Sequence, residues 1–121
     1  MDDYPMTLLT RDQILAADDI KSEVVEVPEW GGSVRVATMS GQVRDRFEAT
    51  CIEAGEESSM ENVRAKMVAF SIVDEQGELV FSVEHIQALG GKSSKALDRV
   101  FDVSQRLSKI TADEVEELAK N

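Results

Sequence analysis

The sequence is poor in the residues from which cross-links and metal sites are built. Cys51 is the only cysteine and His85 the only histidine among 121 residues. One cysteine excludes a disulfide within the chain, and one histidine has no second ligand beside it. A domain of this length buries roughly two-thirds of its unfolded surface, so it needs neither a disulfide nor a metal site to hold its core. We expect Cys51 to be a small buried hydrophobe and His85 to lie on the surface.

Long apolar runs are also absent. No stretch approaches the roughly 20 apolar residues of a membrane-spanning helix. The first residues, from Met1 to Pro5, are acidic and lack the basic and apolar parts of a signal peptide. We therefore expect no membrane partner and a cytoplasmic protein.

The motifs of common catalytic sites are missing as well. Gly91-Lys92-Ser93 resembles the end of a phosphate-binding loop, but Ile86 stands where that loop needs its first glycine. Metalloprotease and nucleophile-elbow motifs are absent. Adjacent acids such as Asp18-Asp19 are typical of solvated loops. The sequence predicts a protein that is not an enzyme, with no catalytic, cofactor-binding or metal-binding residues.

Basic residues are scarce relative to acidic ones. The chain has 24 acidic and 13 basic residues, which gives a formal net charge of -11. Nucleic acids and anionic membranes attract Lys and Arg patches, so this chain should be repelled by both. The acidic excess either serves solubility alone or complements a basic partner, and the composition leaves both open.

Residues 23–27 and 33–38 carry the alternating, β-branched pattern of strands. Pro28 ends the first of them, and Gly31-Gly32 provides the backbone freedom that a turn needs. The sequence therefore predicts a β-hairpin with Trp30 near its tip. Trp30 either folds back onto the sheet as core or stays exposed as a contact residue.

Capping residues and apolar spacing predict six helices. Their caps are Thr10 (with Gln13), Ser40, Ser58 (with Glu61), Ser82, Ser93 or Ser94, and Thr111 (with Glu114). The expected core faces are Ile14 and Leu15; Val43, Phe47 and Cys51; Val63, Met67 and Val68; Ile86 and Leu89; Leu97, Val100, Phe101, Ser104 and Leu107; and Val115 and Leu118. The first helix is expected to end near Asp18-Asp19, and Gly90-Gly91 to close the fourth.

Residues 70–73 and 79–81 form either a second hairpin around Gly77 or a helix that runs directly into a strand. The fold class that follows is α+β: a small single domain with one or two β-hairpins packed against several amphipathic helices. Residues 1–9 are expected to be a flexible N-terminal arm, and residues 10–121 to be the domain.

Three segments carry a resemblance to a known family. The first runs from Val25 through Val-Pro-Glu-Trp-Gly-Gly (27–32) to Val36 and continues from Met39 to Glu48. The second is 69–77, and the third is 96–107 together with 118–121. In their order and spacing these segments resemble the tail assembly chaperones of long-tailed bacteriophages (siphophages). The loop at 55–59 and the N-terminal arm match no part of that pattern.

The resemblance implies a non-catalytic chaperone of the host bacterial cytoplasm, absent from the mature virion. Its client would be the tape measure protein, which it would keep soluble while the tail tube protein assembles around it. The chain would resemble the short form of a pair whose longer form arises by ribosomal frameshifting. Self-association into a homo-oligomer is also implied.

Within the first segment, Trp30, Arg44, Asp45 and Arg46 are the candidate partner-binding residues. The alternative for the Arg-Asp-Arg run is a solvated helix face. Three other functions remain open at this point: a structural tail or head–tail connector component, a small acidic inhibitor or adaptor, for instance a DNA mimic, and, least supported, an enzyme.

Overall fold

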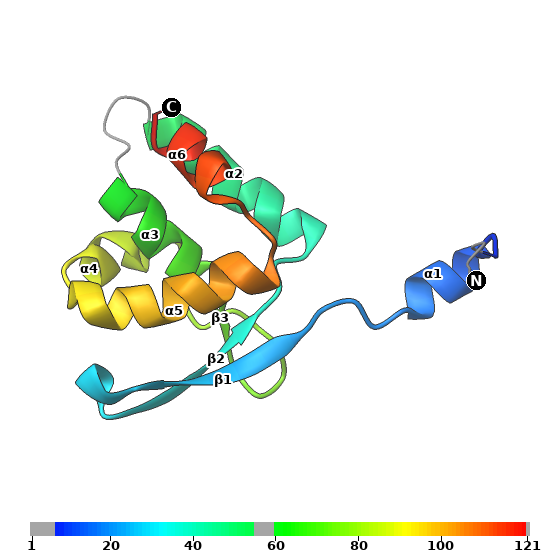
Figure 1. Ribbon diagram of the computed structural model, residues 1–121, viewed down its shortest axis with the longest axis horizontal. Helices are drawn as coiled ribbons and strands as arrows, with labels where there is room; N and C mark the ends of the chain where they lie inside the picture. The colour runs from blue at the N-terminus through cyan, green and yellow to red at the C-terminus, as the bar shows by residue number, and fades with distance from the viewer. Residues whose placement is uncertain (1–6, 55–59, 121) are drawn as a thin grey trace.

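The computed structural model describes residues 7–54 and 60–120 of the chain. Three antiparallel strands form one sheet in the order β1 (Ser22–Val27), β2 (Gly32–Ala37) and β3 (Ile72–Val73). Helices cover one face of this sheet (Figure 1). The predicted α+β class is confirmed.

The predicted first hairpin is present. β1 and β2 pair from Ser22 opposite Ala37 to Val27 opposite Gly32. A short 3-10 helix, η1 (Pro28–Trp30), connects them, and Gly31 follows it with φ of 77°. That positive φ strains any residue with a β-carbon, so glycine is required there. β2 lies one residue earlier than predicted at both ends.

The described part of the chain has six α-helices: α1 (Arg11–Ala16), α2 (Gly41–Ala54), α3 (Met60–Ala69), α4 (Ile86–Gly90), α5 (Ser94–Leu107) and α6 (Ala112–Lys120). The predicted caps are largely confirmed. Ser40 Oγ accepts from the Val43 amide at 3.2 Å, and Ser93 Oγ accepts from the Ala96 amide at 3.3 Å. Thr111 and Glu114 form the predicted reciprocal box. The predicted Ser58 cap lies outside the described residues.

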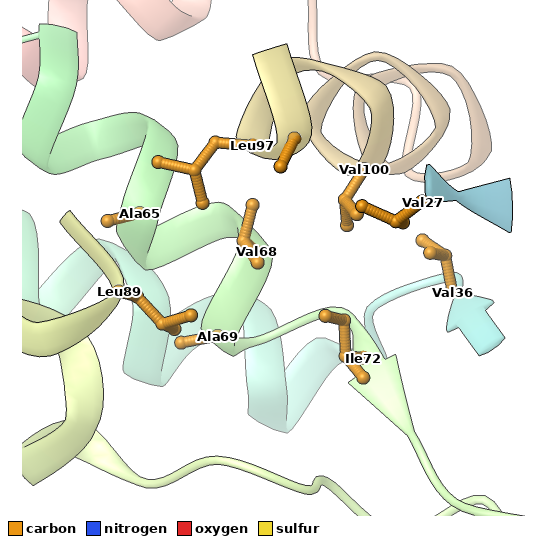
Figure 2. Close-up of a cluster of buried hydrophobic side chains, with 10 residues drawn as sticks. Val27, Val36, Ala65, Val68, Ala69, Ile72, Leu89, Leu97 and Val100 are labelled. Carbon is orange, nitrogen blue, oxygen red and sulfur yellow. The ribbon is translucent and has the colours of Figure 1, made fainter. Parts of the chain in front are cut away.

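The larger of two core clusters joins the sheet to the helices. Val27 and Val36 from the sheet meet Val100 and Leu97 of α5, while Val68 of α3 packs between them (Figure 2). All five side chains are almost fully buried. Burial of each such side chain contributes about 1.5–3 kcal/mol, so this cluster fixes α3 and α5 on the sheet.

The second core cluster packs helices α2, α3 and α6 together, away from the hairpin tip. Phe47 and Cys51 of α2 pack with Met67 of α3 and Val115 of α6. The ring of Phe47 meets that of Phe70 edge-on, with centroids 6.2 Å apart. The predicted faces of α2, α3 and α6 are therefore confirmed, and Cys51 is buried as expected.

The second predicted hairpin is reduced to one strand and a single bridge. α3 ends at Ala69, and two turn residues later β3 begins, so the helix runs almost directly into the strand. β3 has only two residues, and Leu79 forms an isolated bridge with Val73. The Asp74 carboxylate accepts from the amides of Gln76 and Glu78 inside the turn, and beyond the turn the Val80 amide donates to the Ile72 carbonyl at 3.1 Å.

Helix α1 stands apart from the packed body (Figure 1). Its capping box between Thr10 and Gln13 is formed as predicted. No residue of α1 is buried, so the expected core face of Ile14 and Leu15 is wrong. Packing begins at Lys21, whose carbonyl accepts from the Thr38 amide at 2.8 Å.

Candidate binding site around Trp30 and Phe81

Trp30 lies at the tip of the β1–β2 hairpin, half-buried against the larger core cluster. An ion pair holds this tip in place. Arg99 Nε and Nη2 each donate to one oxygen of the Glu29 carboxylate at 2.9 Å, which joins η1 to α5. Trp30 therefore packs partly against the core cluster and is partly exposed.

The exposed side of Trp30 lies between two neighbouring hollows. One has a volume of about 440 Å³ and is lined by Val24, Val34, Val73 and Val80 among others. The other has a volume of about 460 Å³ and is lined by His85, Ala88, Leu89 and Lys92 among others. Trp30 and Phe81 line both, so the two hollows form one region, which we call the Trp30–Phe81 surface.

The first hollow exists because β3 is short. β3 pairs with β2 only at Arg35 and Val36, so the part of β2 nearer the tip has no strand beside it on that side in the described structure. Instead of a strand, the segment that contains Val80 and Phe81 lines the hollow beside this part of β2. A ring contact between Phe81 and His85, 5.8 Å between centroids, links the floor of this hollow to the second one.

Large apolar side chains are exposed at this surface. Val24 is 60% and Val80 52% exposed within it, and Val83, two residues after Phe81 in the chain, is 59% exposed. Charged groups stand at the rim rather than on the floor: Glu29, Asp74, Glu75, Arg35 and Lys92. The Arg99 guanidinium holds the pKa of Glu29 below its usual value, so this rim carboxylate stays ionised near neutral pH. An apolar floor with a charged rim is suited to binding the apolar face of a peptide or protein segment.

The structure does not bring Arg44, Asp45 and Arg46 to this surface. They lie on α2, which contacts α3 and α6, and in Figure 1 α2 lies away from the hairpin tip. Arg44 bonds Glu48 at 2.8 Å and Glu114 at 3.4 Å, so it links α2 to α6. Asp45 and Arg46 are exposed on that helix. Trp30 and the Arg44–Arg46 run are thus two separate candidate contact regions.

Titratable residues elsewhere form no recognisable reaction centre. Among the described residues, no three His, Cys, Asp or Glu side chains come close enough to hold a metal ion. Burial raises the pKa of the Cys51 thiol, which disfavours the reactive thiolate. His85 is exposed, as expected, and its Nδ1 accepts from the Ser82 amide. No helix in the described part of the chain is long and apolar enough to cross a membrane.

Sequence reasoning missed most of this surface. The apolar pattern predicts a strand at Val80 and Phe81, in which alternate side chains would be buried. No pattern marks Val83. The sequence signal for this part of the surface is the run Leu-Val-Phe-Ser-Val at 79–83. It is strongly apolar, yet it is too short to form a stable strand.

Comparisons with family models, with characterised proteins and with solved structures found no match to this chain.

Proposed function

We propose that this protein is a tail assembly chaperone of a long-tailed bacteriophage, which binds the tape measure protein and takes no part in covalent chemistry. The observation that carries the proposal is the Trp30–Phe81 surface. It is an apolar, concave region built around the most recognisable segment of the resemblance, on a chain of net charge -11.

The client's binding mode follows from the chemistry of the surface. A tape measure protein is long and largely helical, and an amphipathic helix places its apolar face into a groove of this kind. Trp30 and Phe81 supply rigid aromatic area, which loses little conformational entropy on binding. The rim charges of Arg35, Lys92 and Glu29 then orient the polar flanks of the bound helix.

The acidic charge supports the same role. A client kept soluble by a bound chaperone gains the chaperone's charge, and complexes of high net charge repel one another. The excess of carboxylates also favours a client with basic flanks over nucleic acid. Location in the host cytoplasm and absence from the virion belong to this proposal.

Co-expression with the client tests it. The chain should keep the tape measure protein in the soluble fraction and co-purify with it. Val80→Asp and Phe81→Ala should each reduce co-purification about tenfold or more, since a charge or a void at the centre of an apolar contact removes most of its binding energy. Ile52→Asp, an exposed apolar position outside this surface, is the matched control and should bind as the unchanged protein does.

Each contrary result has a defined meaning. Loss of the client in Arg46→Ala, with Val80→Asp unaffected, would move the binding site to α2. No solubilisation of the client, together with detection of this chain in purified virions, would replace the chaperone by a structural tail component.

A further inference from the structure

The exposed apolar side chains of this protein fall into two groups. Of the large apolar side chains exposed in the described part, five lie in residues 7–20: Leu8, Leu9, Ile14, Leu15 and Ile20. Three more, Val24, Val80 and Val83, lie at or beside the Trp30–Phe81 surface, and only Ile52 lies elsewhere. One chain therefore carries both an unpacked apolar segment and an open apolar surface.

Residues 7–20, which we call the α1 segment, bury no side chain in the packed body of their own chain. Leu8 is 93% and Leu15 77% exposed, values that leave these side chains almost wholly in water. A helix of six residues is far below the ~12–15 residues at which isolated helices become marginal in water. Its complete capping box fixes where the helix begins but does not supply the missing packing.

We propose that the α1 segment of one copy docks on the Trp30–Phe81 surface of a second copy. Leu8, Ile14 and Leu15 would lie against Val24, Val80 and Phe81. This inference concerns assembly and does not rest on the proposed chaperone function.

The charge of helix α1 supports it as the occupant. The chain as a whole has a net charge of -11, so most approaches between two copies are repulsive. Helix α1 carries one Arg and one Asp and is neutral overall, whereas the whole α1 segment, which includes Asp18 and Asp19, has a net charge of -2. Its Arg11 is exposed and available to Asp74 and Glu75 on the rim of the first hollow. Helix α1 itself can thus meet the surface of another copy without adding net negative charge to the contact.

The direction of the α1 segment favours a second copy over the same one. The α1 segment leaves the body at the start of β1, at the end opposite the hairpin tip, and points away from it (Figure 1). Six residues of β1 place the tip about 20 Å from that start. To reach Trp30 of its own chain, the α1 segment would have to turn back at residues 17–20 and lie along β1, opposite to the direction that it takes in Figure 1.

Such a contact joins two different surfaces. It builds head-to-tail rings or chains, or a dimer when two copies exchange segments reciprocally. The average mass of the full-length protein in sedimentation equilibrium should therefore rise above that of one chain across the micromolar range. Leu8→Asp with Leu15→Asp should weaken self-association at least tenfold, and so should Val80→Asp with Val83→Asp. Ile52→Asp, a matched exposed apolar position outside both regions, should assemble as the unchanged protein does.

A mixture of the two double variants gives the decisive result. The first retains an intact surface and the second an intact α1 segment, so together they should form pairs but nothing larger. A synthetic peptide of residues 7–20 should dissociate the unchanged protein, a test that needs no folded variant. A single-chain mass at every concentration, failure of both the mixture and the peptide, or equal loss of assembly in Ile52→Asp would each overturn the proposal. Protection of α1 amides from hydrogen exchange in a monomer would do so too, because it would place the segment on its own chain.

Discussion

The side chains that hold the second core cluster together are few, so single residues there have large effects. Phe47 is fully buried, and its ring contacts Phe70 edge-on. Phe47→Ala should lower the free energy of unfolding by about 3–5 kcal/mol, from lost transfer energy and the cavity left behind. Urea denaturation measures this. Ile52→Ala, five residues later on the same helix but 64% exposed, should change it by less than about 0.5 kcal/mol.

A pair of buried hydroxyls tests a different residue-level effect. Ser71 Oγ and Ser104 Oγ hydrogen-bond to each other in the interior, between the turn after α3 and helix α5. Ser104→Ala should cost about 1–3 kcal/mol, because it leaves the Ser71 hydroxyl buried without its partner. Ser71→Ala with Ser104→Ala should cost less than the sum of the single changes. Strict additivity in a double-mutant cycle would show that the bond is energetically silent.

At the scale of elements, the sequence predicts correctly the features that depend only on residues close together in the chain. Thr111–Glu114 and Thr10–Gln13 form their boxes because three-residue spacing alone sets that geometry. The two-residue length of β3 could not be predicted, because it depends on pairing with β2, which β3 meets only at Arg35 and Val36. Pairing between strands far apart in sequence is set by the tertiary fold and leaves no periodic signature.

The attachment of the hairpin to α5 also belongs to this scale. Arg99 binds Glu29 near the tip, and Arg106 binds Glu23 at 2.7 and 2.8 Å near the other end. These charge-assisted bonds lower the pKa of both glutamates. A carboxyl whose pKa is lowered by folding stabilises the fold above its unfolded pKa, about 4.3, and loses that contribution as pH falls through its folded pKa.

Glu29→Gln should therefore lower the unfolding temperature at pH 6–8, and the difference from the unchanged protein should shrink steadily below about pH 4. Thermal unfolding followed by circular dichroism at several pH values measures it. Taking the difference removes the general effect of protonating the other carboxylates. The control is Glu75→Gln, which makes no ion pair with the described residues and should show no such shrinking difference. A gap that persists unchanged at pH 3 would contradict the ion-pair explanation.

On the scale of the whole molecule, the sequence predicted Trp30 as a contact residue but not the surface around it. The position of Trp30 could be predicted because the hairpin that carries it is formed by residues close together in the sequence. Val80 and Phe81 come from a distant part of the chain, and only the tertiary fold places them beside Trp30 and Val24 of the hairpin. The exposure of Ile14 and Leu15 was hidden for the opposite reason: their helical spacing is typical of a core face, and the surface that would cover them lies on another copy in our proposal.

If both proposals hold, assembly and client binding compete for one surface. A surface occupied nine-tenths of the time by an α1 segment binds its client about tenfold more weakly, because apparent affinity falls with the fraction of competent sites. Leu8→Asp with Leu15→Asp should then bind a client peptide about tenfold more tightly than the unchanged protein, at concentrations where the latter is assembled. Titration by fluorescence anisotropy measures this, and at concentrations too low for assembly the two proteins should bind alike. Equal affinity under assembling conditions would show that client and α1 segment occupy different surfaces, which leaves each proposal to its own test.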